Sequence, residues 1–252
     1  MTTSPMEQSR NFLKDTVRLT VDFSQTDQHR GLPAPPLEKS FAPDAKRIDL
    51  TPPGQWINIA GADLETAMRN RESRREFSNT PLTLDELSFL LWATQGVRRR
   101  LDRTTALRTV PSAGARHALE TYLAVLNVDS LQPAFYRYLP MEHQLLLEFA
   151  EQQMKPKLVE ATLGQTFIGR AAVVFIWTAI PYRMEWRYGL ASHKVIAMDA
   201  GHVCQNLYLA CEAIGAGTCA VAAYHQELID QLLRLDGKEE FVIYLASVGK
   251  KD

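Results

Sequence analysis

Apolar residues recur at helical spacing in five stretches of the chain that begin after residue 60. In the clearest one, Thr83 and Glu86 form a capping box ahead of an apolar stripe, and Gly96 marks the end. The stripe consists of Leu84, Leu87, Leu90 and Leu91. The other predicted helices span residues 63–68, 155–163, 193–215 and the stretch that contains Leu228, Leu232 and Leu233.

Apolar runs typical of β-strands lie between these helices. The run Val173–Ala179 is nearly continuous, which predicts a strand buried on both faces of a sheet. Further strands are predicted at Tyr122–Val128, Leu145–Phe149, Thr218–Tyr224 and Phe241–Val248. Together these elements predict an α+β fold in which helices, one of them very apolar, flank both sides of a central mixed sheet.

The first 54 residues differ from the rest in composition. Seven of the 13 prolines lie before residue 54, and the stretch has little periodicity. We therefore expect a proline-rich N-terminal arm at residues 1–54, extended or partly disordered and without an apolar strand. Residues 55–252 contain no repeat or linker, so they are expected to form one domain.

Composition excludes several classes of protein. A formal net charge of -1 gives no reason to expect nucleic acid or an anionic membrane as a partner. The longest apolar run, Ala171–Ile180, is about half the length that spans a bilayer, and the N-terminus has no signal-like apolar segment. Cys204, Cys211 and Cys219 lack metal-ligand spacing, so we expect no metal and free thiols in a cytoplasmic protein.

Two short segments carry candidate binding groups. Arg71, Ser73 and Arg75 form a compact donor cluster that suits a phosphate dianion, although a solvated helix end would look the same. The small residues of Pro111–Gly114 would let the backbone approach a flat ligand, although an ordinary loop is the better reading without context.

Two further segments are polar within apolar surroundings. Asp199 and His202 are one helical turn apart, close enough to pair within a subunit or at a dimer contact. The strand that ends in Lys250 delivers positive charge, either to the same phosphate as the arginines or to solvent. The arginines at positions 98, 99, 100, 103 and 108 are read as a solvated loop rather than as the rim of a site.

In this order, the motifs RxSxRxF, RTxPSAGARH, DAGHxxQNLxLAxxAxGxGTCAV and the terminal Gly-Lys resemble the nitroreductase superfamily. The resemblance is closest to its SagB-type branch, the azoline dehydrogenases of modified peptides, and runs from about Ala62 to Lys250. It implies a nitroreductase-like fold and a homodimer with FMN at the interface. By resemblance, Arg71, Ser73, Arg75 and Lys250 hold the phosphate end, Pro111, Ser112, Ala113 and Gly114 line the flavin from the partner subunit, and Ala222 and Ala223 face the ring.

At two places the sequence departs from the family pattern, and these departures bear on the predicted reaction. Arg187 and Tyr188 stand where azoline dehydrogenases tend to carry Lys-Tyr, and arginine cannot serve as a general base as lysine can. Gly114 or Ala115 stands near the place of the asparagine in PSxxN. No catalytic side chain is assigned, and Trp186, Arg187 and Tyr188 are candidate substrate-contacting residues. A substrate-facing lid is predicted in an irregular segment that contains Tyr182, Arg183, Trp186 and Tyr188.

The sequence therefore predicts an FMN-dependent oxidoreductase that passes hydride between NAD(P)H or a reduced substrate and an organic acceptor. Two alternatives stay open: an azoline-to-azole dehydrogenase acting on a ribosomal peptide, and a non-enzymatic flavin-binding subunit.

Overall fold

The computed structural model describes residues 4–57, 59 and 61–251. Seven α-helices lie within these residues: α1 (Pro5–Leu13), α2 (Leu64–Asn70), α3 (Leu84–Gln95), α4 (Met154–Ala161), α5 (Tyr182–Tyr188), α6 (His193–Ala213) and α7 (Gln226–Leu232). The strands are β1 (Arg47–Asp49), β2 (Val97–Arg100), β3 (Ala106–Arg108), β4 (Leu119–Val125), β5 (Ala134–Leu139), β6 (Gln144–Phe149), β7 (Val173–Ala179), β8 (Ala216–Val221) and β9 (Phe241–Lys250). Short 3-10 turns complete the chain at η1 (Thr16–Thr20), η2 (Phe23–Gln25), η3 (Ala113–Ala115), η4 (Thr166–Arg170) and η5 (Gly189–Ser192).

Seven of the strands form one sheet in the order β1-β6-β5-β4-β7-β9-β8. Each pair of neighbours in it is antiparallel, which corrects the expected mixed sheet. Short loops join β4 to β5 and β5 to β6, and such hairpins can only be antiparallel. Parallel pairing is confined to two isolated bridges, one of which joins Ser73 to Thr218.

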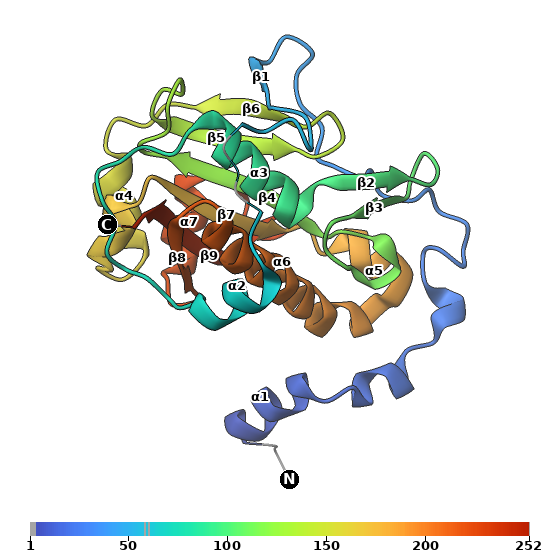
Figure 1. Cartoon of the computed structure of the whole chain (residues 1–252). Helices are drawn as coiled ribbons and strands as arrows, with labels where there is room; N and C mark the ends of the chain where they lie inside the picture. The colour runs from blue at the N-terminus through green and yellow to red at the C-terminus, as the bar shows by residue number, and fades with distance from the viewer. Residues whose placement is uncertain (1–3, 58, 60, 252) are drawn as a thin grey trace.

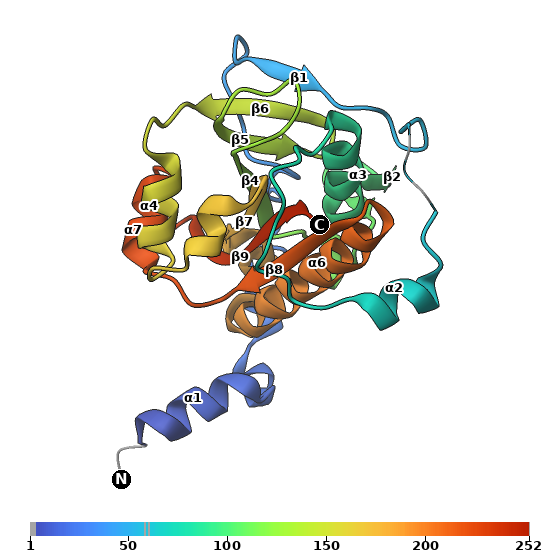
Figure 2. The ribbon, with the colours of Figure 1, turned by 60° about the vertical axis from the view of Figure 1, so that its left-hand side comes forward.

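Helices cover both faces of this sheet, as expected for the α+β fold (Figure 1, Figure 2). On β7, Val173, Phe175 and Trp177 pack into one core with residues of α3 and α6. The alternate residues Val174 and Ile176 pack into a second core with residues of α4 and α7. The whole of β7 is buried, which confirms the strand with two buried faces.

The helical predictions agree with the structure within a few residues. Thr83 caps α3 and forms the predicted capping box with Glu86. The long apolar helix is α6, which ends at Ala213. All three cysteines are buried and free, as predicted.

The arm contains regular structure that the sequence did not indicate. β1, the short and mostly polar strand Arg47–Asp49, pairs with β6 at the edge of the main sheet. Farther upstream, the backbone N–H of Lys39 donates to the Glu120 carboxylate at 2.7 Å. The first helix, α1, stands apart from the body of the molecule (Figure 1, Figure 2), and none of its residues is buried.

Glu120 is the centre of a buried ion-pair network that fixes the arm and α5 to the sheet. Arg183 of α5 and Arg137 of β5 both pair with its carboxylate. Burial alone would raise the pKa of Glu120, but the charges of Arg183 and Arg137 outweigh it and the pKa is lowered. Arg137 also donates to the carbonyl oxygen of Lys39 at 2.8 Å, so the network holds the arm directly.

Candidate functional site

The segment from Arg71 to Phe77 lies along the edge strand β8. Ser73 bridges to Thr218, and the Arg74 N–H donates to the Thr218 carbonyl oxygen at 2.9 Å. A Cβ added to Gly217 would lie 2.7 Å from the Arg74 side chain, so the glycine is needed for this close approach. The predicted phosphate-binding segment is therefore held against the sheet rather than free in solution.

The arginines of this segment have different partners. Arg74 pairs with Glu72 at 2.6 Å. The Arg71 guanidinium lies 5.4 Å from the centroid of the Tyr208 ring, and that of Arg75 lies 5.8 Å from the Phe167 ring. Within the described residues neither Arg71 nor Arg75 is ion-paired to a carboxylate, so both charges are available to an anionic ligand.

A cavity of about 440 Å³ opens beside this cluster. Its lining consists of Glu72, Ser73, Arg74, Arg75, Glu76 and Lys251. The side chain of Lys250, the lysine predicted to join the cluster, instead donates to the Glu86 carboxylate and to the Ile214 carbonyl oxygen. Successive side chains on a strand point to opposite faces, which explains why Lys251 lines the cavity and Lys250 does not.

Tyr208 of α6 joins the cluster, although the sequence did not indicate it. Its hydroxyl accepts the Ala220 N–H at 2.9 Å and lies 2.8 Å from the Ser73 hydroxyl. Because the Ala220 amide already donates to Tyr208, the tyrosine proton is available for Ser73. The Ser73 proton can then be donated to a ligand.

The turn at Pro111–Gly114 lies against the first half of α6. The Ser112 hydroxyl accepts the His117 N–H at 3.0 Å, and Gly114 has a φ of 58°, a left-handed conformation that favours glycine. Burial raises the pKa of Asp199, opposed by its interactions with Ser112, His202 and the Ala113 amide. The predicted proximity of Asp199 and His202 is present, at 3.9 Å between Oδ1 and Nδ1.

Arg187 and Tyr188 lie next to this turn. A Cβ added to Gly114 would be 2.5 Å from the Tyr188 hydroxyl and 3.1 Å from the Arg187 Cδ. The structure thus brings together two segments that are more than 70 residues apart in the sequence.

Trp186 does not form a lid. The segment predicted to be irregular is the helix α5, and Trp186 is 8% exposed beneath the N-terminal arm. Its indole N–H donates to the Leu32 carbonyl oxygen at 3.0 Å, and the Arg116 guanidinium lies 5.2 Å from its ring centroid. A contact between residues 154 positions apart gives no local signal in the sequence.

Ala222 and Ala223 follow directly after β8 and are exposed. The Ala223 carbonyl oxygen accepts the Gln165 side-chain amide at 2.9 Å. Ala222 lies four residues beyond Thr218, which corresponds to roughly 13 Å along a strand. The arginine cluster and the predicted ring-facing alanines thus share one sheet edge.

Within a single subunit, the arginine cluster and the Pro111–Gly114 turn lie apart. The cluster contacts α6 at Tyr208, and the turn lies near Asp199. Nine helical residues separate these positions by about 13 Å along the axis, and they point in roughly opposite directions.

The basic run is not a simple solvated loop. β2 and β3 form a hairpin in which Arg98, Arg99 and Arg100 are exposed. Arg108 is buried, and its guanidinium donates to Gln95 and to the Leu37 carbonyl oxygen. The predicted solvent exposure is therefore present at Arg98, Arg99 and Arg100, but they belong to a strand, Arg98 also lines a cavity, and the prediction was wrong for Arg108.

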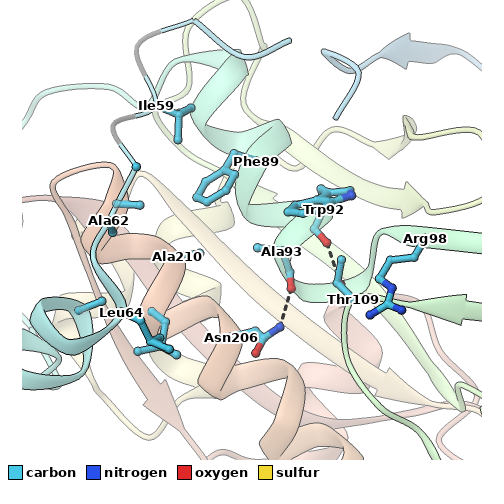
Figure 3. A pocket seen from close by; sticks show the side chains of 14 residues that line it. Ile59, Ala62, Leu64, Phe89, Trp92, Ala93, Arg98, Thr109, Asn206 and Ala210 are labelled. Atoms are coloured by element: carbon cyan, nitrogen blue, oxygen red, sulfur yellow. Dashed lines mark hydrogen bonds between the residues drawn. The ribbon is translucent and has the colours of Figure 1, made fainter. Parts of the chain in front are cut away.

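A larger cavity, of about 580 Å³, lies between α2, α3 and α6 (Figure 3). Phe89 and Trp92 of α3 and Ala210 of α6 form part of its apolar wall. Asn206 donates to the Ala93 carbonyl oxygen at 2.8 Å and fixes the two helices beside it. The sequence did not indicate this cavity.

Neither a metal-binding cluster nor a membrane-spanning helix occurs within the described residues. No group of three or more His, Cys, Asp or Glu side chains there is arranged to hold a metal ion. Across the same part of the chain, no helix is long and apolar enough to cross a membrane.

Comparison with known proteins identifies the family. The model of the Nitroreductase family matches residues 68–250, a range that includes every predicted site residue. This chain belongs to the nitroreductase family.

Individual relatives agree with this assignment. A Methanocaldococcus jannaschii protein named as a nitroreductase is 35% identical over 197 residues, which cover 78% of this chain and 96% of the relative. A Ralstonia eutropha structure named as a nitroreductase has 27% identity and a TM-score of 0.68, covering 88% of this chain and 99% of that one.

A third structure extends the likeness of fold to the arm. A chain of the E. coli microcin synthetase McbBCD complex, which contains truncated pro-MccB17, has a TM-score of 0.61 at 18% identity. The match covers 99% of this chain and 98% of that one.

Proposed function

We propose that this nitroreductase-family chain is an FMN-dependent oxidoreductase that works as a homodimer. The observation that carries the proposal is the cluster of Arg71, Ser73 and Arg75 at the edge of β8, where Ser73 and Arg75 line a cavity and Arg71 lies over the neighbouring Tyr208 ring. Two guanidinium groups without a carboxylate partner suit a phosphate dianion, since each charge-assisted bond contributes about 1.5–3 kcal/mol. The family match adds the flavin as the cofactor to which such a phosphate belongs.

The residues present fit this cofactor along one sheet edge. Arg71, Ser73 and Arg75 would hold the phosphate. Lys250, which holds Glu86, and Lys251, which is paired with Glu212 at 2.9 Å, would add positive charge nearby. The backbone at Ala222 and Ala223 would face the flavin ring near its N5 edge, with the buried Val221 packed beneath. When bound, FMN supplies hydride transfer between NAD(P)H or a reduced substrate and an organic acceptor.

A partner subunit would complete the site. The turn formed by Pro111, Ser112, Ala113 and Gly114 cannot reach the arginine cluster of its own chain, because the two segments contact opposite sides of α6. The surface of α6 between them carries Met198, Gly201 and Gln205, all exposed. Met198, Leu64 and Met68 are 53–60% exposed, and the apolar cavity of Figure 3 continues this surface.

Flavin titration of purified full-length protein tests the proposal. We expect Arg71→Gln and Arg75→Gln each to weaken FMN binding about tenfold or more. Arg69→Gln is the matched control, because this α2 arginine is exposed and pairs with Glu65. A colourless protein that takes up no FMN would refute the proposal.

Rapid mixing of the reconstituted protein with NADH or NADPH then separates an enzyme from a flavin-binding subunit. Bleaching of the flavin absorbance, and its return on addition of a quinone or a nitroaromatic compound, is the expected result. A flavin that stays oxidised with both donors would favour the non-enzymatic alternative.

The second candidate is azoline oxidation in a ribosomal peptide, favoured by the likeness of fold to the microcin synthetase chain over almost its entire length. Arg187 stands against it, because a guanidinium keeps its proton and cannot take one from a substrate. Mass spectrometry of an azoline-containing peptide incubated with the protein tests this candidate. Loss of two hydrogen atoms per ring would favour it over the reductase.

A further inference from the structure

A second polar cavity lies between the N-terminal arm and the end of α5. Its volume is about 440 Å³, and its lining consists of Arg18, Phe23, Gln28, His29, Arg187 and Tyr188. Arg187 and Tyr188 also contact Gly114, so the cavity lies beside the turn that we propose to line the flavin.

Hydrogen bonds fix the arm that forms one wall of this cavity. The Gln28 N–H donates to the Trp186 carbonyl oxygen at 2.9 Å, and the Trp186 indole donates to the Leu32 carbonyl oxygen at 3.0 Å. The Tyr182 hydroxyl donates to the Asp27 carboxylate at 2.8 Å. Both walls therefore keep a defined separation, as a binding pocket requires.

The charged groups that line the cavity are basic. These groups are Arg18 and Arg187, and none of the described lining residues is a carboxylate. Of the nearby acids, Asp15 pairs with the Arg18 Nε at 2.7 Å and Asp27 accepts from Tyr182, so Arg187 is the lining arginine that remains available to an anion. Burial, and then the charge of Arg187, lowers the pKa of the neighbouring Arg116, so positive potential extends behind the cavity.

The shape of the cationic groups indicates the ligand. A guanidinium fork matches a carboxylate or phosphate with two parallel hydrogen bonds, and the rings of Phe23 and Tyr188 provide flat apolar surface. We propose that this cavity binds the anionic end of a planar substrate whose other end reaches the flavin. The proposal rests on the proposed function and names the substrate class of that site.

Calorimetry with ligands that cannot react tests the cavity without any turnover. Full-length wild-type protein should bind benzoate about tenfold or more tightly than benzyl alcohol, because only benzoate offers an anion to the guanidinium. Arg187→Gln should reduce this preference to about twofold or less, and Arg18→Gln should reduce it in part. Arg10→Gln on the exposed helix α1 is the control and should leave the preference unchanged.

Steady-state kinetics of the flavin-loaded protein shows whether the anionic group belongs to the electron acceptor or to the hydride donor. If the anion belongs to the acceptor, Arg187→Gln should raise KM for para-nitrobenzoate about tenfold and leave KM for para-nitrobenzyl alcohol unchanged. If it belongs to the donor, the KM for NADPH rises instead.

Equal binding of benzoate and benzyl alcohol by the wild-type protein, with no change in any KM in Arg187→Gln, would overturn the inference. If this result is obtained with a protein that binds FMN and turns over a substrate, the inference about the cavity fails and the proposed function stands. A protein that takes up no FMN overturns the proposed function, while the calorimetry still tests the cavity.

Discussion

The Tyr208 hydroxyl oxygen forms hydrogen bonds with two neighbouring segments. It accepts from Ala220 on the edge strand and contacts Ser73 in the arginine segment. The sequence could not identify it, because Tyr208 occurs in α6 as one of several buried residues on an apolar helix. Its partner Ser73 is 135 residues away, so only the fold reveals the contact.

Tyr208→Phe should therefore weaken FMN binding about tenfold, because Ser73 loses the group that orients its hydroxyl. Fluorescence titration with FMN measures this effect, and chemical unfolding of the same samples reports stability. Tyr136→Phe is the control, since the Tyr136 hydroxyl donates to the Gln132 carbonyl oxygen in another part of the sheet. Each variant should lose about 1 kcal/mol of stability. A similar loss of FMN affinity in both would contradict the positioning role of Tyr208.

Glu38 is a residue at which stability is expected to respond to pH. Burial, followed by the interaction with Glu142, raises its pKa from 4.5 to about 7. Between these values the folded chain binds more protons than the unfolded chain, so this contribution to stability is lost as the pH rises through that window.

Glu38→Gln should remove the pH dependence and make the protein more stable than wild type at about pH 8. Because Glu38 is only partly buried, we expect a difference on the order of 1 kcal/mol. Urea unfolding at several pH values measures it, with the exposed Glu227→Gln as the control. Parallel pH profiles for wild type and Glu38→Gln would contradict the prediction.

At the scale of elements, the sequence predicted best where the periodicity was strong and the partners were local. The Thr83 cap, α6 and β7 could be predicted because their signals lie within a few residues. β5 was not predicted because Arg137 stands in its middle, and only Glu120 and Glu148, from other strands, make that arginine a buried residue. The same limit applies to the site: the order of the motifs indicated the arginine cluster, but the sequence could not show that Lys250 is bonded to Glu86 while Lys251 lines the cavity.

The exposed surface of α6 yields a prediction at this scale. Met198→Glu places a charge on the surface that we propose to be shared with a second copy, so it should shift the protein from dimer to monomer and reduce FMN uptake with it. Light scattering coupled to size exclusion measures the mass. Leu163→Glu, at a residue 61% exposed just after α4, is the control and should leave the mass unchanged. A wild-type protein that is already monomeric would refute the proposed dimer.

At the scale of the whole molecule, the N-terminal arm consists of two parts, one that stands apart from the body and one that is hydrogen-bonded to it. α1 has no buried residue, whereas residues 27–32 are hydrogen-bonded to α5. The division into an arm at 1–54 and a domain at 55–252 stays a prediction, because β1 lies within the arm and yet belongs to the sheet.

Two truncations test this difference. Removal of residues 1–14 should change the Tm by about 1 °C or less, because it uncovers no apolar surface. Removal of residues 1–32 exposes the Trp186 indole and should lower the Tm by about 5 °C or more. Differential scanning calorimetry measures both, and equal Tm values for the two truncations would show that the arm does not cover Trp186 in solution.

The position of β9 governs the order in which the protein can be assembled during synthesis. β9 lies between β7 and β8 in the sheet although it follows both in the chain. On the ribosome, β8 therefore has no strand to pair with until β9 has left the exit tunnel, and its edge stays open to chaperones or to other nascent chains. The edge at Thr218, which holds the arginine segment, and Lys251, which lines the same cavity, therefore come together only after that moment. Nascent chains that end before β9 should therefore be unable to retain flavin.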